Sequence, residues 1–167
     1  MNFIDSLQNF VLSLPEAIQF LGVSLVAMIP FIENYGAVVV GSVAGVPVWV
    51  AVLMAIIGNL AVVAVLTLIA SGTREAIVAR SSSGSSAGGT VESSPRQDNV
   101  RRLFDRYGVP GVTLLGMLVV PTHVIAPTLV SFGSPKTVVL VWQAISITLY
   151  AVVAGLLVNG LINLAGF

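Results

Sequence analysis

The chain has 167 residues, of which 56% are hydrophobic and only 8% charged, and its seven basic and seven acidic side chains balance. Soluble domains carry about 25% charged residues, so this composition excludes a water-facing surface and predicts an all-α integral membrane protein. The zero net charge argues against a nucleic-acid partner, and the lack of cysteine excludes disulfides, thiolate chemistry and cysteine-ligated metals.

Residues 1–16 are predicted to form an amphipathic helix that lies in the membrane interface. Phe3, Leu7 and Phe10 recur at helical spacing with polar residues between them, and Pro15 ends the pattern.

Two stretches are long and apolar enough to cross a bilayer completely. Residues 48–70 and 137–158 carry no charge, and at ~1.5 Å per residue each exceeds the ~30 Å hydrocarbon core. Asn59 lies midway along the first span and Gln143 in the second. Such polar groups more often hydrogen-bond neighbouring helices than bind substrate, although Asn59 is placed to contact a hairpin tip.

The apolar segments 17–46 and 109–134 are each broken in the middle, by Pro30 and by Pro121. Their arms of roughly 10 to 15 residues reach only about 15 to 22 Å, too short to cross the membrane. We therefore expect two re-entrant helical hairpins that pack against the full spans. The alternative is that both segments are tilted full spans.

Residues 71–108 are predicted to form a cytoplasmic connector, with a disordered Ser/Gly loop at 81–95 between short basic helices. Six of the seven basic residues fall between Arg74 and Arg106, which by the positive-inside rule places this segment in the cytoplasm. The basic face of its second helix consists of Arg101, Arg102 and Arg106.

The first repeat, 17–70, and the second, 109–167, follow the same order of hairpin, Gly-x-Pro and span. Because the first span runs inward and the second outward, the halves have opposite topology. This inverted repeat is typical of secondary transporters, whose sites lie where broken helices meet.

Glu33 falls at the predicted tip of the first hairpin, followed by Asn34 and Tyr35. A charged side chain at bilayer depth costs about 2.5 to 3.5 kcal/mol on insertion scales, so such residues are rare without a partner or a task. We expect Glu33 to exchange a proton in a site shared with Asn34, Tyr35 and Asn59. The alternative is a shallow hairpin in which Glu33 lies among headgroups and caps backbone amides.

His123 is the only histidine, and it follows Pro121 and Thr122 at the equivalent tip of the second hairpin. Histidine changes charge near neutral pH, so a His123–Glu33 pair facing each other would carry a proton. The alternative is a neutral imidazole hydrogen-bonded to a carbonyl near Pro121. One histidine and one glutamate fall short of a metal site, and neither metal nor cofactor is predicted.

Small residues at helical spacing predict close helix packing, within the chain or between chains. The two pairs are Gly41 with Gly45, and Ala151 with Gly155.

The motif "PFIENYGA" at 30–37, followed by "IGN" at 57–59, resembles the signature of the small multi-drug export proteins. Those are distant relatives of the DedA, or VTT-domain, membrane proteins. The segment "RYGVPGVTLLGMLVVPTHV" at 106–124 is similar to the second hairpin of the actinobacterial branch. By position, Glu33 matches the acidic residue of the first hairpin and Asn59 the asparagine of the next span.

The resemblance implies two re-entrant hairpins that face each other, and transport of a small molecule or a lipid driven by the proton gradient. Two departures bear on it. Tyr35 stands where many members have arginine, and "PTHV" at 121–124 replaces a Pro-Gly-rich tip.

The sequence therefore predicts a proton-coupled transporter of a bacterial inner membrane, and not an enzyme, since no hydrolase elbow, Walker loop or catalytic carboxylate pair is present. Two full spans enclose little, which favours a homodimer. The alternative function is a non-transporting scaffold that docks partners through its Arg-rich connector.

Overall fold

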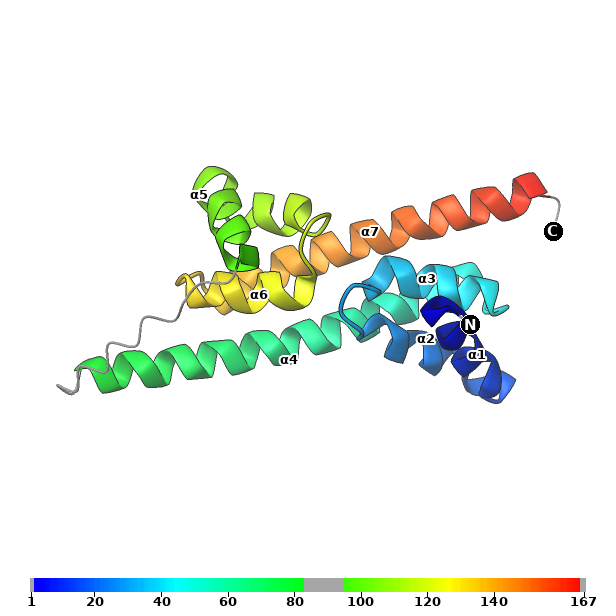
Figure 1. The fold of residues 1–167 in the computed structure, drawn as a ribbon, viewed down its shortest axis with the longest axis horizontal. Coiled ribbons are helices and arrows are strands. Elements are labelled where there is room, and N and C mark those ends of the chain that lie inside the picture. Colours follow the sequence, from blue (N-terminus) through cyan, green and yellow to red (C-terminus); the bar gives the residue numbers. More distant parts are fainter. Residues whose placement is uncertain (1, 83–94, 166–167) are drawn as a thin grey trace. The chain divides into compact units, whose positions relative to one another are not determined.

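The structure, a computed structural model, describes residues 2–82 and 95–165, with the side chains of 2–76, 102 and 104–164. Within these residues every regular element is helical, which confirms the all-α class (Figure 1). The elements are α1 (Phe3–Ser13), the 3-10 turn η1 (Glu16–Ile18), α2 (Gln19–Ala27), α3 (Glu33–Val43), α4 (Val48–Ser82), α5 (Pro95–Gly116), α6 (Thr122–Ser131) and α7 (Lys136–Ala165). The predicted Ser/Gly loop lies, from 83 to 94, outside the described residues.

The two predicted spans lie in α4 and α7. Val48–Ala76 and Lys136–Leu164 each have 29 residues and contain an 18-residue stretch with a mean hydropathy of 2.7 and 2.1, respectively. Both are long and apolar enough to cross a membrane. Large aliphatic side chains on their surfaces, such as Leu53 and Leu149, are 56% and 50% exposed. Apolar side chains repeated along the outside of a helix suit lipid rather than water. These two helices support the predicted membrane class.

Helix α4 continues without interruption to Ser82, where the sequence predicted a separate short helix at 73–80. The only candidate breaker nearby is Gly72, and one glycine costs a helix only about 1 kcal/mol.

By its contacts the chain divides into two compact units, which are described one at a time. Unit 1 comprises Met1–Val62 and Ile145–Phe167, and unit 2 comprises Val63–Ala144.

In unit 1, the turn at 28–32 connects α2 to α3, and these two helices pack against each other (Figure 1). Helix α1 packs against both. The chain bends by 113° between α1 and the helical segment Glu16–Ala27, at a proline that cannot continue the helix. Leu7 and Val11 of α1 are buried, while Phe3 and Phe10 are 61% and 38% exposed. Helix α1 thus has one edge in the core and an apolar outer edge.

Small residues allow the helices of unit 1 to approach closely. A Cβ on Gly41 of α3 would lie 2.6 Å from Val23 Cγ2 of α2, and one on Gly155 of α7 would lie 2.5 Å from Val52 Cγ2 of α4. Neighbouring Ala151 is fully buried. Gly45 differs, because nothing lies within 4 Å of its Cβ position.

In unit 2, α5 kinks at Gly108, which has φ 64° and ψ −166°. This lies in a region that essentially only glycine adopts. Helix α5 packs against α6, and the rings of Phe104 and Phe132 lie 6.0 Å apart, tilted by 54°. The part of α5 before the kink therefore contacts the end of α6 through this aromatic pair.

Gly45 and Gly133 end α3 and α6 in the same backbone conformation, with φ of 91° and 102°. In both places the amide of the next residue bonds to the carbonyl five residues back, at 3.0 and 3.1 Å. This is the Schellman motif, which closes a helix with a left-handed glycine. A proline then directly precedes each long helix, so the two Gly-x-Pro sequences specify the same turn.

Candidate functional site

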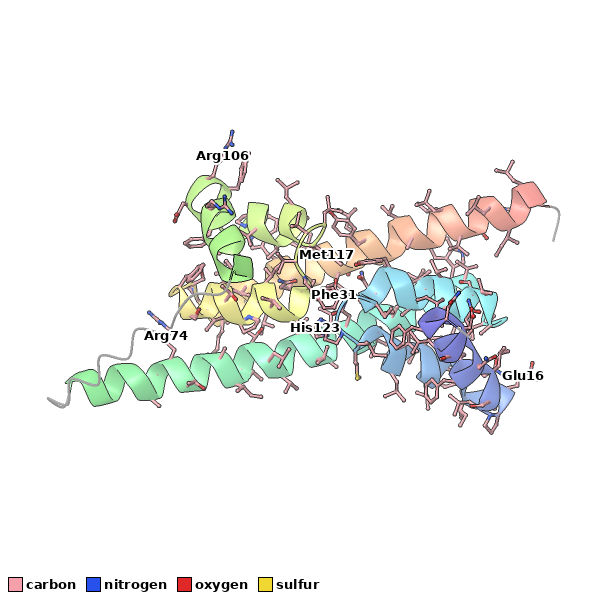
Figure 2. All side chains as sticks on the ribbon, in the orientation of Figure 1. Glu16, Phe31, Arg74, Arg106, Met117 and His123 are labelled. Atoms are coloured by element: carbon pink, nitrogen blue, oxygen red, sulfur yellow. The ribbon has the colours of Figure 1, made fainter. Side chains whose placement is uncertain are left out.

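Two non-glycine residues where α2 passes into α3 have positive φ, one in the turn and one at the start of α3. Phe31 has φ 72° and Glu33 has φ 53°, and Figure 2 labels Phe31 at this turn. Each such conformation costs of order 1 to 3 kcal/mol and persists only where the surroundings impose it. Two of them within three residues mark this turn as a strained segment, a common property of functional sites.

Polar side chains lie in the core directly after this turn. Glu33 and Asn34 are completely buried, whereas Tyr35 is 37% exposed. The Asn34 carboxamide Nδ2 donates to the backbone carbonyl of Ile147 in α7, and its Oδ1 is buried with no hydrogen-bond donor among the described residues. Asn34 thus fixes the strained turn against α7 and keeps one acceptor unused.

Asn59 lies on the buried face of α4, within the same unit, and is completely buried. The preceding residue, Gly58, explains how α4 comes so close to α2. A Cβ on Gly58 would lie 2.1 Å from the carbonyl oxygen of Ser24, so no other residue fits. The "IGN" motif thus combines a close helix contact with a buried carboxamide.

The buried face of α4 continues in unit 2 with Thr67 and Ser71, which are spaced four residues apart and are 0% and 7% exposed. Their hydroxyls donate to α4's own carbonyls, Thr67 to Val63 at 2.6 Å and Ser71 to Leu68 at 2.9 Å. The hydrogen-bonding capacity of these two hydroxyl donors is therefore used within α4 itself.

The second predicted tip lies in unit 2, at the start of α6. Pro121 is the N-cap residue, with φ −57° and ψ 143°, and Thr122 and His123 are 0% and 7% exposed (Figure 2). The break predicted at Pro121 is therefore present, and both polar side chains are buried. Since Glu33 and His123 belong to different units, their pairing stays a prediction.

Gln143 of α7 is a buried residue that the sequence analysis assigned to hydrogen bonding between helices and did not include in the predicted site. It is completely buried, and neither its Oε1 nor its Nε2 has a hydrogen-bond partner in the described part of the chain. The signal that could have marked it is its place as the only carboxamide of an uncharged span, 137–158.

The predicted basic face of the connector is placed only in part. Arg102 and Arg106 are exposed, Arg106 lies 5.1 Å from the centre of the Tyr107 ring, and Figure 2 shows its side chain directed away from the helices. The side chain of Arg101 lies outside the described residues.

Among the described residues, no three His, Asp or Glu side chains gather as metal ligands would. Comparison with protein-family models, curated proteins and solved structures found no match.

Proposed function

We propose that this protein is a proton-coupled membrane transporter of a small molecule or a lipid, with the turn between α2 and α3 as its proton site. The observation that carries the proposal is Glu33, a completely buried carboxyl group in a left-handed conformation. It belongs to a chain with two helices able to cross a membrane.

Burial makes a charged carboxylate more costly than the neutral acid. A carboxyl group that is alternately enclosed and wetted therefore takes up a proton in one state and releases it in the other. Asn34, adjacent in sequence and bonded to α7, would couple the turn to movement of that helix. His123, buried at the start of α6, is the second candidate for a titrating group.

The lengths of the short helices support re-entrant hairpins. Helices α2, α3 and α6 have 9, 11 and 10 residues, or about 14 to 17 Å each, roughly half of a ~30 Å hydrocarbon core. The matching turns at Gly45 and Gly133 support the inverted repeat. The resemblance to the small multi-drug export proteins points the same way.

The test uses full-length protein in proteoliposomes that contain a pH dye, with and without a pH gradient. Ethidium serves as the small-molecule probe and a fluorescent phosphatidylethanolamine as the lipid probe. We expect the Glu33→Gln variant to lose the part of the flux that depends on the gradient. The matched control is Glu16→Gln, an exposed carboxylate in η1, which should behave as wild type.

A Glu33→Gln variant that keeps both the flux and its pH dependence would overturn the proton site. If wild-type protein moves neither probe, the second candidate function gains weight. That function, a membrane scaffold, is favoured by the exposed Arg102 and Arg106. It predicts a partner that co-purifies with wild type and is lost from the Arg102→Gln/Arg106→Gln variant.

A further inference from the structure

We propose that unit 2 contains a binding site for the phosphate headgroup of an anionic phospholipid, separate from the proton site. The site is a cavity of about 340 Å³ lined by residues of α4, the end of α6, the α6–α7 turn and the first turn of α7. Its lining residues are Ser71, Arg74, Glu75, Val130, Gly133, Ser134, Pro135, Lys136 and Thr137. The inference does not depend on whether the protein transports anything.

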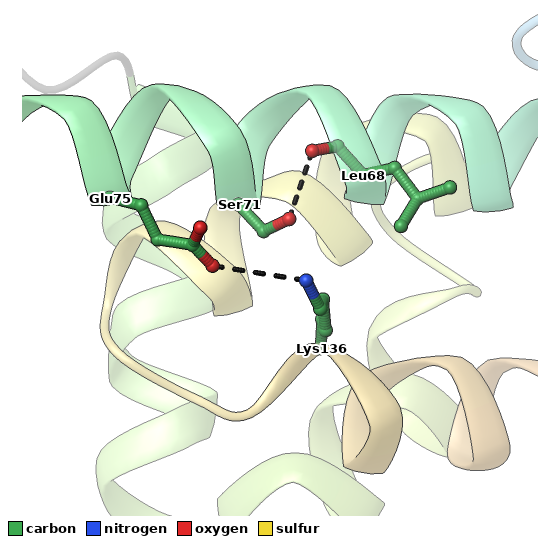
Figure 3. Close-up of polar contacts among 4 residues, drawn as sticks. All are labelled: Leu68, Ser71, Glu75 and Lys136. Carbon is green, nitrogen blue, oxygen red and sulfur yellow. Dashed lines mark hydrogen bonds and ion pairs between the residues drawn. The ribbon is translucent and has the colours of Figure 1, made fainter.

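The charges of this cavity favour an anion. Arg74 and Lys136 supply two positive charges against the single carboxylate of Glu75. Lys136 Nζ lies 3.8 Å from Glu75 Oε1, with side chains 45% and 72% exposed (Figure 3). An ion pair so exposed contributes little, so a phosphate can compete for the lysine.

The Arg74 guanidinium lies close to the backbone that borders the cavity. A Cβ on Gly133 would lie 3.1 Å from a terminal nitrogen of the Arg74 guanidinium, so Arg74 lies directly over the backbone of the α6–α7 turn. Gly133 has φ 102°, and the same residue therefore makes the turn and makes room for the guanidinium. A planar guanidinium at this position suits two-pronged contact with phosphate oxygens.

Neutral donors converge on the same space. The first amides of α7 have no acceptor within the helix, and they carry the positive end of its dipole. Ser134, also in the lining, is only 9% exposed, and its hydroxyl makes no hydrogen bond to any part of the chain that the structure describes. The hydroxyl of this largely buried serine, two cations and a helix N-terminus together make a donor set for a phosphate group.

The place of the cavity along the helices identifies the source of the phosphate. Arg74 and Glu75 fall in the last turn of the apolar segment Val48–Ala76, and Lys136 begins the segment Lys136–Leu164. If these segments cross a membrane, their ends lie at headgroup level. Within two turns toward the apolar side, Leu68 and Val141 are 52% and 58% exposed. A phospholipid can therefore place its phosphate in the cavity and its acyl chains along these side chains, which a soluble phosphate cannot.

The experiment measures lipid retention by the full-length protein. Protein is incorporated into nanodiscs of phosphatidylcholine with phosphatidylglycerol, extracted into mild detergent, and bound lipids are counted by native mass spectrometry. We expect selective retention of phosphatidylglycerol, and a loss of about tenfold or more in the Arg74→Gln/Lys136→Gln variant, since each cation near an anionic surface is worth about fivefold. Removing the opposing carboxylate by Glu75→Gln should raise retention by about fivefold.

The matched control is Arg102→Gln/Arg106→Gln, which removes the same charge from α5 without touching the cavity lining. It should retain phosphatidylglycerol as wild type does. The charge-preserving Arg74→Lys/Lys136→Arg variant should keep most of the phosphatidylglycerol retention. Circular dichroism measures the helix content of all variants. Together these two controls distinguish a loss of charge from a loss of structure. Equal losses in the two charge-removing variants would show diffuse electrostatics and overturn the site.

A second arm distinguishes the sources of phosphate. Inorganic phosphate and glycerol phosphate are added to protein in the same mixed nanodiscs of phosphatidylcholine with phosphatidylglycerol, and are tested for displacement of the retained phosphatidylglycerol. No displacement at low-millimolar concentration supports the lipid. If glycerol phosphate at low-millimolar concentration displaces the retained phosphatidylglycerol, the site binds a soluble phosphate ligand, and the proposal is overturned.

Discussion

Asn34 donates a hydrogen bond from its carboxamide Nδ2 to the backbone carbonyl of Ile147, a residue 113 positions away in the chain. Through this bond the strained turn before α3 is held against the middle of α7. The bond is buried, and a buried hydrogen bond contributes about 0.5 to 1.5 kcal/mol net, with a larger loss when a partner is left unsatisfied.

Replacing Asn34 should therefore destabilise unit 1. We expect Asn34→Ala to lower the Tm in detergent by about 2 to 6 °C, since 1 kcal/mol corresponds to ~2–4 °C in a protein of this size. The control Asn9→Ala changes an exposed asparagine of α1 and should leave the Tm unchanged. Equal Tm values for the two variants would contradict the role of the Asn34 bond.

Gly58 should be intolerant of any side chain. A Cβ there would lie 2.1 Å from the Ser24 carbonyl oxygen, so Gly58→Ala must separate α2 from α4, at a cost of about 1 to 3 kcal/mol or more. Gly72→Ala is the control on the same helix, because nothing lies within 4 Å of its Cβ position. Thermal unfolding should show a fall for the first variant and no fall for the second, which gains helix propensity.

Gly45 tests backbone conformation separately from packing. Its φ is 91° and its Cβ position is open, so Gly45→Ala adds strain without a clash. We expect a loss of about 1 to 2 kcal/mol, the cost of a left-handed conformation for an L-residue. Gly160→Ala, in α7 and equally open, should be neutral or stabilising. A neutral Gly45→Ala would mean that the turn takes another conformation.

The carboxamide of Gln143 should contribute little to the stability of the folded protein. Its buried amide has no described hydrogen-bond partner, so the unbranched, similarly sized Gln143→Met should leave stability unchanged or raise it by about 1 kcal/mol. Denaturation in detergent measures this, with Gln8→Met on α1 as the control for the substitution itself. A marked fall in stability would show that Gln143 is hydrogen-bonded in the folded protein.

Re-entrance of the α2–α3 hairpin can be tested by labelling, because the natural chain has no cysteine. Phe31 at the turn and Val43 at the end of α3 are 57% and 65% exposed. We expect Val43→Cys to react with an impermeant maleimide from one side of the membrane. Phe31→Cys should stay unlabelled from the opposite side. Efficient labelling of Phe31→Cys from that opposite side would show that the hairpin crosses completely.

Local sequence was sufficient for the helical class and for the two long apolar helices, because length and lack of charge act residue by residue. It also placed the breaks before Glu33 and at Pro121, and the two Gly-x-Pro turns, since proline and glycine restrict their own backbone. The prediction of a separate short helix after Gly72 was wrong, because a single glycine is a weak helix breaker and α4 continues through it.

What only the tertiary structure decided is which polar groups are enclosed together. The Asn34–Ile147 bond, the contact of Gly58 with Ser24, and the cavity that joins Arg74 to Lys136 all connect positions far apart in the chain. No local periodicity encodes such distances, because each depends on how closely helices pack once their small residues meet. The sequence by itself determined that this chain has two helices long and apolar enough to cross a membrane, and helix packing determined which of its few polar side chains are buried.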